Sequence, residues 1–558
     1  MPSGYTRGKP DVSWWLTQIK QGVEFRKRYA HEQRWDTWRK YYRGEWSGHI
    51  LPTNLFFKML RSTVPRVYFR NPRVSVTSKR PGPDGLARAT ILERVDNKML
   101  QQMNIKKHMK QIVHETFLFG TGIGKLGFGA EFTPTPDQLG TQEPLRSGKY
   151  RLEYNSTVFP NMPWFMRVHA GNFIVPAGVA DLESARWAAH WIRRPLDDVR
   201  EDPRLSNTKD LKPSSRSSAD FGTITTNVQD DLVDLIEIRD KKTESVIILA
   251  PYASDKVLLF DADGLQIDGG LPFYSAIFNP DDEVFWGVPD SKILEPQQLE
   301  INEIRTQIMK HRRISMIRIL VEEGGMTVEE AAKLLDEDSP AVLFTKVPPA
   351  AAIRVMEAGE IPQSLLVAEE QVYRDVRENL GFSRNEAGEF VPGSRKPTAA
   401  EVSVVKQAAN IRVDERRDVM ADMLVKVVND MNSVIFENWD EETIIDVAGP
   451  DGAPVWVRFS GTMLKSGRYE VSVDPDTGLP ETRQSRRELA VQAYQLLKDN
   501  PLIRPDGLTR YFLNELGNVA FDDMMQAPVA GPGSQEQPID INDLEALFAE
   551  GQRQGLVQ

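Results

Sequence analysis

Residues 290–313 read DSKILEPQQLEINEIRTQIMKHRR, and residues 363–380 read QSLLVAEEQVYRDVRENL. Apolar residues recur at helical spacing in both segments: Leu294, Ile301, Ile304 and Ile308 in the first, and Leu365, Ala368, Val372, Val376 and Leu380 in the second. The spacing predicts two helices, each with one narrow apolar stripe. Because such helices bury only one side, we expect them to pack against copies of themselves around a wet channel.

The segment between these helices, residues 314–361, predicts a small α/β lobe. It begins with the strand-like ISMIRILV, continues with the helical TVEEAAKLLDE and ends in a second strand-like stretch, PAVLFTKV. After the second helix, a loop over 381–397 leads into a helix from Thr398 to about Glu437, which would be about 60 Å long. We expect strands within 442–473, helices at 481–498 and 507–516, a linker at 526–538 and a short docking helix at 539–550.

The N-terminal half predicts helices followed by strands. Residues 11–46 are predicted as one helix in which tryptophans and tyrosines alternate with arginines and lysines. Such a mixture is typical of nucleic-acid stacking or, the interpretation we favour, of packing residues with basic neighbours that reach water. A second helix starts at Pro83 and stops at Gly120. Short strands fill 125–278, interrupted by loops at 133–149 and 201–227, so the fold class is α+β.

Composition excludes several classes of protein. The 558 residues favour several modules, and no apolar run approaches the length that spans a bilayer. The first residues, MPSGYTRGKPDVS, contain no apolar signal core, so we do not expect export. Cysteine is absent, which excludes disulfides, thiolate nucleophiles and zinc or iron bound through cysteine sulfur.

Basic and acidic residues are distributed unevenly along the chain. Residues 1–130 hold 24 Lys and Arg against 9 Asp and Glu, whereas the remaining residues hold 45 against 71. The basic part suits nucleic acid or an acidic partner, and the acidic part would weaken any tight hold on a DNA duplex. Neutralisation within the chain is the alternative interpretation.

No motif predicts an enzyme, a cofactor or a metal site. The string GTGIGKLG at 120–127 resembles a phosphate-binding loop, but it follows a helix, lacks Ser or Thr after Lys125 and leads into a strand, so we interpret its glycines as a turn. The aspartates in DADGLQIDGG (261–270) and DPDTG (474–478) lack the acidic residue that completes a calcium loop, and turns explain them better. His108 and His114 are six residues apart, which does not suit a metal.

Several strings in the order LPFY (271–274), FWGVP (285–289), PQQ (296–298), EIN (300–302) and the basic end Lys310–Arg313 resemble the portal proteins of tailed bacteriophages. The likeness extends to FLFGTGIGKLGF (117–128), PTAAE (397–401) and GLP (478–480), and covers about residues 40–515. The resemblance implies a ring, usually of twelve subunits, at one vertex of the capsid, through which DNA is packaged and ejected. It implies location in the virion after assembly in the host cytoplasm.

The resemblance also assigns parts. Residues 1–288 and 398–475 would form the wing, 289–313 and 362–380 the stem helices, 314–361 the clip, 381–397 the tunnel loop and 476–558 the crown with a flexible tail. DNA would pass the tunnel-loop residues Phe382, Arg384, Phe390, Arg395 and Lys396. A stem basic cluster would consist of Lys310, His311, Arg312 and Arg313. Implied partners are double-stranded DNA, the terminase large subunit, head–tail adaptor and tail proteins, major capsid and scaffolding proteins, and no membrane.

Other functions stay open at this point. One alternative is a nucleotide-dependent nucleic-acid enzyme that uses the glycines at 120–127. Others are a connector or scaffold protein without a complete portal architecture, or a bacterial coiled-coil adaptor.

Overall fold

The computed structural model describes most, but not all, of the chain. The described residues are 3–6, 8–46, 52–68, 73–79, 82–128, 162–202, 204–213, 232–251, 253–261, 267, 270–314, 318–321, 353–356, 362–380, 399–439, 443–448, 454–459, 461–465, 467–473, 491 and 494–495. Within the strands at 318–321, 353–356, 443–448 and 454–459, and at some helix ends, only the backbone is described.

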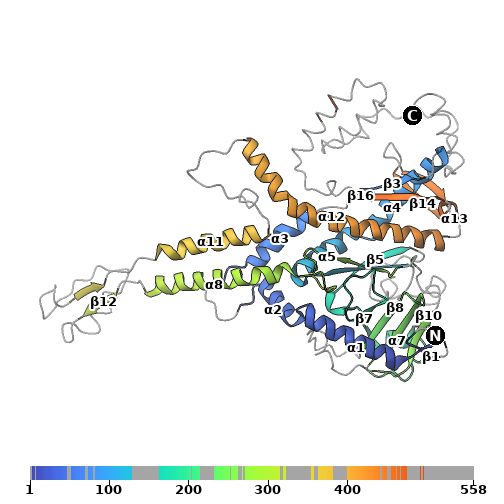
Figure 1. The fold of residues 1–558 in the computed structure, drawn as a ribbon, viewed down its shortest axis with the longest axis horizontal. Coiled ribbons are helices and arrows are strands. Elements are labelled where there is room, and N and C mark those ends of the chain that lie inside the picture. Colours follow the sequence, from blue (N-terminus) through green and yellow to red (C-terminus); the bar gives the residue numbers. More distant parts are fainter. Residues whose placement is uncertain are drawn as a thin grey trace, which may run out of the picture. The chain divides into compact units, whose positions relative to one another are not determined.

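The longer helices confirm the periodic segments of the sequence. The helices are α1 (Val12–Tyr29), α2 (Glu32–Arg43), α3 (Leu55–Val67), α4 (Pro83–Gln102), α5 (Ile105–Phe119), the 3-10 turn η1 (Ala170–Asn172), α7 (Leu196–Glu201), α8 (Asp290–Ile314), α11 (Gln363–Leu380), α12 (Ala399–Asn438) and α13 (Gly461–Lys465) (Figure 1). The predictions for 290–313, 363–380 and 398–437 are therefore right to within a residue or two.

All described strand pairs are antiparallel. The strands are β1 (Tyr5–Thr6), β2 (Lys9–Pro10), β3 (Val74–Ser78), β4 (Gly122–Phe128), β5 (Pro163–Val168), β6 (Phe173–Ile174), β7 (Trp187–Pro195), β8 (Leu232–Asp240), β9 (Ser245–Leu249), β10 (Val257–Asp261), β11 (Phe273–Ala276), β12 (Arg318–Val321), β13 (Ile353–Met356), β14 (Thr443–Ala448), β15 (Pro454–Phe459) and β16 (Tyr469–Val473). They form a five-stranded sheet in the order β10-β9-β8-β7-β6, a three-stranded sheet β11-β4-β5 and four strand pairs, β1-β2, β12-β13, β14-β15 and β16-β3. Helices and antiparallel sheets together confirm the mixed α+β class.

The chain divides into two compact units. Unit 1 comprises residues 1–36, 60–290 and 410–558, and unit 2 comprises residues 37–59 and 291–409. Within the described part of the chain, no helix is long and apolar enough to cross a membrane.

One core of unit 1 lies between α1 and the five-stranded sheet. Asp11 starts the helix by accepting hydrogen bonds from the backbone N–H groups of Ser13 and Trp14, at 3.0 and 3.3 Å. Trp15 is fully buried and meets the indole of Trp187 on β7 edge to face. The aromatic residues of α1 therefore include packing residues, as the favoured interpretation of that segment predicts.

A larger core of unit 1 gathers α4, α5 and the second half of α12. Its buried members include Leu92, Ile112, Val113, Leu424 and Met431. The strand pair β16-β3 packs on the same core through Val471 and Val74. The strands β3 and β16, about 400 residues apart in the sequence, thus form one strand pair that packs on this core.

Two predicted helices are each divided by one residue with positive φ. His31 has φ 53° and separates α1 from α2, and Asn104 has φ 52° and separates α4 from α5. At the first break, buried Arg26 bonds to Glu32 at 3.1 Å and to the carbonyl of Phe173 at 2.9 Å. These bonds hold the two helix ends in a bend, so the single helix predicted over 11–46 is wrong, as is the single helix over 83–119.

The remaining predictions of helices, strands and loops have mixed outcomes. The helix α3 and the strand β3 were not predicted, whereas the strands expected within 125–278 and 442–473 are present as β4 to β11 and as β14 to β16. The loop 133–149, the tunnel loop 381–397, the lobe's helix and second strand at 327–347, the linker and the docking helix lie outside the described residues, as do the terminal helices except for three residues at 491 and 494–495.

Candidate functional site

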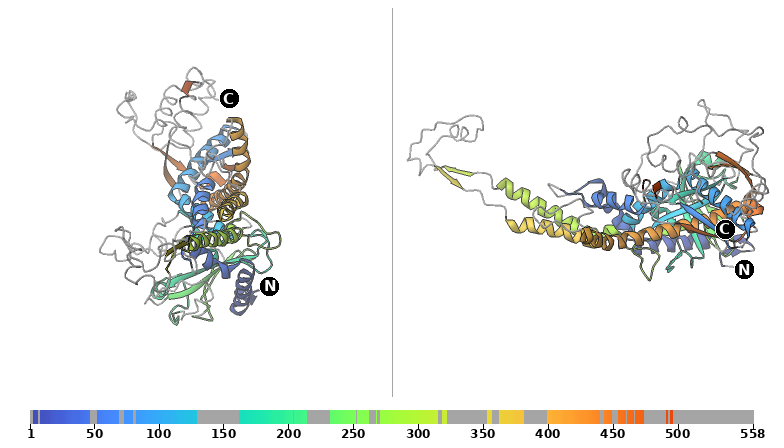
Figure 2. Two further views of the ribbon diagram at one scale, coloured as in Figure 1. Left: turned by 90° about the vertical axis from the view of Figure 1, so that its left-hand side faces the viewer. Right: turned by 90° about the horizontal axis from the view of Figure 1, so that it is seen from above.

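The helices α8 and α11 form an antiparallel pair in unit 2. Their ribbons run side by side in Figure 1 and again in Figure 2, and Arg305 of α8 forms an ion pair with Glu369 of α11. The end of α8 leads into β12 and the end of β13 leads into α11, and β12 pairs with β13 from Arg318↔Met356 to Val321↔Ile353. Unit 2 therefore contains a helical hairpin that carries a strand pair.

Gln298 of α8 caps the start of α3. Its Oε1 accepts hydrogen bonds from the backbone N–H groups of Leu55 at 2.8 Å and Phe56 at 3.4 Å, and its Nε2 donates to the carbonyl of Thr53 at 2.6 Å. The first N–H groups of a helix have no partner within the helix, so a fully buried glutamine side chain satisfies them here. This is the second glutamine of the PQQ string, whose role is structural.

Asn302 extends the same contact by one turn. Its Oδ1 accepts from the backbone N–H of Thr53 at 2.9 Å and from Nε2 of Gln298 at 3.1 Å. Closer to the start of α8, the indole N–H of Trp38 donates to Glu295 at 3.0 Å. Glu295, Gln298 and Asn302 therefore bond α8 to Trp38 and to the chain at residues 53–56.

The apolar stripes of the two helices are largely buried within one chain. Fully or almost fully buried are Leu294, Ile301 and Ile304 of α8, and Val372, Val376 and Leu380 of α11. This corrects the expectation that only identical copies would cover these stripes. The sequence pattern is satisfied inside a single subunit because α8 lies beside α11 and residues 37–59.

A second set of apolar side chains on the hairpin is exposed. Leu299 of α8 is 39% exposed, and Leu366 and Val367 of α11 are 52% and 67% exposed. On the same helix α8, Oε1 of Gln297 and Nδ2 of Asn302 are buried and have no hydrogen-bond partner among the described residues. Exposed aliphatic groups on both helices of the hairpin make this surface a candidate interface.

The predicted site residues fall at the end of α8 or outside the described residues. Lys310 and Arg312 are exposed and His311 is half-buried in the last turns of α8, whereas the side chain of Arg313 is not described. Cations in this position interact favourably with the helix dipole. The tunnel-loop residues Phe382, Arg384, Phe390, Arg395 and Lys396 all lie outside the described residues.

Two of the family-like strings meet in unit 1. Gly120 ends α5 with φ 88°, and a Cβ atom there would lie 2.1 Å from the carbonyl oxygen of Gly287. The hydroxyl of Thr121 accepts a hydrogen bond from the N–H of Gly287 at 3.2 Å. The glycines of FLFGTG and FWGVP are thus adjacent because two backbones approach closely there.

The other glycines of the 120–127 string lie in a strand, not in a turn. Gly122, Gly124 and Gly127 belong to β4, and a Cβ atom on Gly124 or Gly127 would overlap the rings of Phe165 or Trp164 on β5. The prediction of a turn is right only for Gly120. The remaining glycines leave room for aromatic rings across the strand pair.

Lys125 is bonded inside the protein. Its Nζ lies 2.9 and 2.8 Å from the two carboxylate oxygens of Glu237 on β8, and both side chains are buried. Burial lowers the pKa of Lys125 to about 8, although the Glu237 carboxylate acts in the opposite direction. The bond links the three-stranded sheet to the five-stranded sheet, so the lysine of the phosphate-loop-like string has a structural partner.

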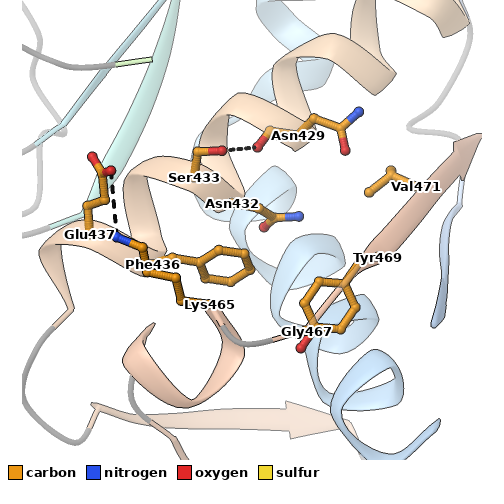
Figure 3. Close-up of a pocket in the computed structure, with 9 residues that line it drawn as sticks. All are labelled: Asn429, Asn432, Ser433, Phe436, Glu437, Lys465, Gly467, Tyr469 and Val471. Atoms are coloured by element: carbon orange, nitrogen blue, oxygen red, sulfur yellow. Dashed lines mark hydrogen bonds and ion pairs between the residues drawn. The ribbon is translucent and has the colours of Figure 1, made fainter. Parts of the chain in front are cut away.

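A polar pocket lies between α12, α13 and β16 (Figure 3). Its volume is about 390 Å³, and its lining residues are Asn429, Asn432, Ser433, Phe436, Glu437, Lys465, Gly467, Tyr469 and Val471. Asn432 is 5% exposed and donates to the buried carboxyl of Asp96 at 3.1 Å. Burial raises the pKa of Asp96 well above its ordinary value, although the hydrogen bond from Asn432 acts in the opposite direction. No pattern in the sequence predicted this pocket.

The remaining candidates do not assemble a reactive centre. Among the described residues, no group of three His, Asp or Glu is placed to hold a metal ion. Asp261 lies at the end of β10, and the other aspartates of the calcium-like strings are not described. His108 and His114 are both on α5, and burial followed by nearby positive charge lowers the pKa of each to about 4.

Comparison with known proteins gives no further assignment. No model of a known protein family matches the sequence, and none of the curated proteins matches it.

Proposed function

We propose that this chain is the subunit of a bacteriophage portal, a ring at one capsid vertex through which DNA is packaged and ejected. In this proposal unit 2 supplies the stem and clip, and a separate ATP-hydrolysing terminase supplies the driving force. The protein itself would be a conduit and a docking platform, without enzymatic activity. The strand pair β12-β13 and its neighbours would meet the terminase first and the head–tail adaptor and tail proteins later.

The observation that carries the proposal is the hairpin of α8 and α11 with its strand pair, followed by the long helix α12. This order of helix, lobe, helix, intervening segment and long helix agrees with the stem, clip, tunnel loop and wing helix implied by the resemblance. The exposed Leu299, Leu366 and Val367 support contact with neighbouring subunits, because they lie on helices whose inner stripes are already covered.

Electron microscopy of the purified chain tests the proposal directly. We expect rings with rotational symmetry, an axial hole and a mass that is a multiple of 63.2 kDa. A particle that remains a monomer at micromolar concentration, with an unchanged melting curve on dilution, would overturn the proposal.

A double variant tests which surface forms the ring. Leu366→Asp with Val367→Asp places two charges on the exposed apolar positions, so we expect loss of the ring with little change in the melting temperature of the monomer. The matched control places the same two charges at Ser364 and Asn379, which are exposed polar positions of the same helix. Equal loss of rings in both variants would argue against a specific role for the apolar pair.

The tunnel-loop bases have a separate test. Neutralising Arg384, Arg395 and Lys396 together should change packaging or genome retention in an infection assay, if these side chains contact the DNA in the channel. Unchanged packaging and retention, with rings still present, would remove the assigned role from these three residues only.

A further inference from the structure

The polar pocket of unit 1 contains a buried amide oxygen whose hydrogen-bonding capacity is not used. Asn432 of α12 is 5% exposed, and its Nδ2 donates to Oδ2 of Asp96 on α4 at 3.1 Å. The other end of the amide, Oδ1 of Asn432, is buried and has no hydrogen-bond partner among the described residues. Figure 3 shows this carboxamide pointing from α12 into the space that Phe436, Tyr469 and Val471 border.

An unsatisfied buried acceptor costs free energy in a folded protein. A polar group that leaves water without gaining a hydrogen bond is destabilising, and such groups are rare in native structures. The pocket provides room for a molecule that would supply the missing bond, because its volume of about 390 Å³ lies in the range of small-molecule sites. A ligand that fits must therefore present an N–H or O–H group to Oδ1 of Asn432.

Two aromatic side chains border the same space. The ring centroids of Phe436 and Tyr469 are 6.1 Å apart, and the ring planes are inclined by 48°. Both side chains are half-buried, so part of each ring is accessible. Aromatic faces bind flat conjugated molecules by stacking. The walls of the pocket therefore favour a planar ligand.

Tyr469 is held in position by the protein itself. Its hydroxyl donates to the carbonyl oxygen of Leu464 at 3.0 Å. Gly467 leaves room for the ring, because a Cβ atom at this glycine would lie 2.1 Å from Cζ of Tyr469. A side chain that is already fixed loses little conformational freedom when a ligand binds, so the pocket is prepared for stacking.

The charged residues of the pocket favour a neutral ligand. Nζ of Lys465 and Oε1 of Glu437 are 3.9 Å apart, and the two side chains are 62% and 40% exposed. An exposed pair of opposite charges has little net field beyond its own contact, and salt screens it further. A phosphate on Lys465 would meet the carboxylate of Glu437, and a cation on Glu437 would meet the ammonium group of Lys465.

We propose that this pocket binds a nucleobase that carries an exocyclic amine, as adenine, cytosine and guanine do. Such a base is neutral and planar, its amine donates to Oδ1 of Asn432, and its face stacks on Tyr469 or Phe436. The base belongs to a free nucleoside or to an unpaired DNA strand, since both present the same amine and the same face. The proposal does not depend on the ring oligomer, because all lining residues belong to unit 1 of one chain.

Calorimetric titration of the full chain with two nucleosides tests the role of Asn432. Adenosine has the amine and purine riboside lacks it, so we expect adenosine to bind the wild type about tenfold more tightly. The variant Asn432→Ala should bind the two nucleosides equally. This ratio is measured within one protein at a time, so a change in stability does not imitate it. Equal affinities in the wild type, or no binding of adenosine up to its solubility limit, would overturn the proposal.

A second pair of variants tests the aromatic face and leaves Asn432 unchanged. Tyr469→Leu removes the face and should weaken the binding of both nucleosides about tenfold. The matched control Tyr469→Phe keeps the face, loses only the bond to Leu464 and should bind adenosine to within about threefold of the wild type. Equal losses in the two variants would contradict stacking and with it the assignment to a base.

Three competitors of adenosine define the class of ligand and its source. An unpaired strand is the source if single-stranded oligodeoxyadenylate competes more strongly than adenosine at equal base concentration, and a free nucleoside is the source if it competes more weakly. Duplex DNA should not compete, because its bases are already paired and stacked. Competition by glucose as strong as that by unlabelled adenosine would overturn the assignment to a planar base.

The same preparation separates this inference from the proposed function. Ring oligomers that bind no adenosine would contradict only the inference. Monomers that bind adenosine with the expected dependence on Asn432 would contradict only the portal.

Discussion

The helices α5 and α8 are held in place by different kinds of interaction. The buried side of α5 is apolar, with Met109, Ile112 and Phe117 fully buried, whereas α8 buries Gln298, Asn302 and Thr306 together with Leu294, Ile301 and Ile304. The first helix is held by area removed from water, and the second by directional bonds to the chain around Thr53.

The basic residues of the two helices differ in the same sense. On α8 Lys310, Arg312 and Arg313 stand at the end that the helix dipole favours, although Lys292 stands in the first turn. On α5 Lys106 and Lys107 stand at the end that the dipole disfavours. The helix α8 is held by side-chain bonds within its own unit. Its exposed aliphatic groups are therefore the feature that this unit does not explain. The apolar buried side of α5 explains how this helix packs, but it does not explain the unfavourable position of its charges. The exposed aliphatic groups are therefore the feature of α8 that the proposed ring would explain, and substitutions test what the charges of α5 contribute.

The largest expected effect concerns the end of α5. Gly120→Ala should destabilise unit 1 by about 3 kcal/mol, because the residue has positive φ and its Cβ atom would overlap the carbonyl of Gly287. The thermal or urea midpoint of the full chain measures this cost.

Gly178→Ala is the matched control for that change. Gly178 has φ 82°, similar to that of Gly120, but no atom lies within 4 Å of its Cβ position. We expect a cost of only about 1 kcal/mol, from the backbone alone. Equal costs at the two positions would mean that the close approach of the two glycine strings contributes nothing.

The next effect concerns the buried polar bonds of α8. Gln298→Leu leaves the N–H groups of Leu55 and Phe56 without their acceptor, so unit 2 should lose about 2 kcal/mol. The neighbouring change Gln297→Leu should be close to neutral, because Oε1 of Gln297 is buried without a partner among the described residues. Hydrogen exchange at residues 53–57 measures the difference, and faster exchange in both variants would contradict the assigned cap.

These residues also show which features the sequence predicts. The segments that became α8, α11 and α12 have long apolar periodicity, which depends on nothing beyond the helix itself. The breaks at His31 and Asn104 depend on one backbone angle each, and periodicity continues across them. The helix α3 has Pro65 near its end, and β3 finds its partner β16 about 400 residues later, so neither has a local signal.

The contacts of the candidate site depend on residues far apart in the sequence. The capping role of Gln298 depends on Thr53 and Leu55, which lie almost 250 residues earlier. In the glycine string, Gly120 lies close to the backbone of Gly287, and this contact cannot be predicted from the sequence alone. The apolar stripes of α8 and α11 are buried, as predicted. The prediction that identical copies would cover them is wrong, because a stripe does not specify which chain covers it.

A smaller effect follows from the histidines of α5. The pKa of His108 and of His114 is lowered from 6.5 to about 4, so the unfolded chain binds more protons than the folded chain between pH 4 and 6.5. Stability should therefore fall as the pH drops from 6.5 toward 4, by about 1 kcal/mol for the pair after allowance for partial exposure.

The variant His108→Gln with His114→Gln isolates this contribution from that of the carboxyl groups. The difference in urea midpoint between wild type and variant should change over this pH range and stay constant above pH 7. If the difference is independent of pH, the two imidazoles are not held neutral by the burial and positive charge around α5.

The smallest expected effect is the most direct test of the contrast, because its sign differs between the helices. Lys106→Glu should stabilise the free protein by about 0.5 kcal/mol, since an acid replaces a base at the start of α5. Lys310→Glu should destabilise it by a similar amount, since an acid replaces a base at the end of α8. Melting at low ionic strength measures both, and 0.5 M NaCl should reduce both toward zero. If Lys106→Glu destabilises the free chain, a structural interaction of Lys106 outweighs the effect of the helix dipole.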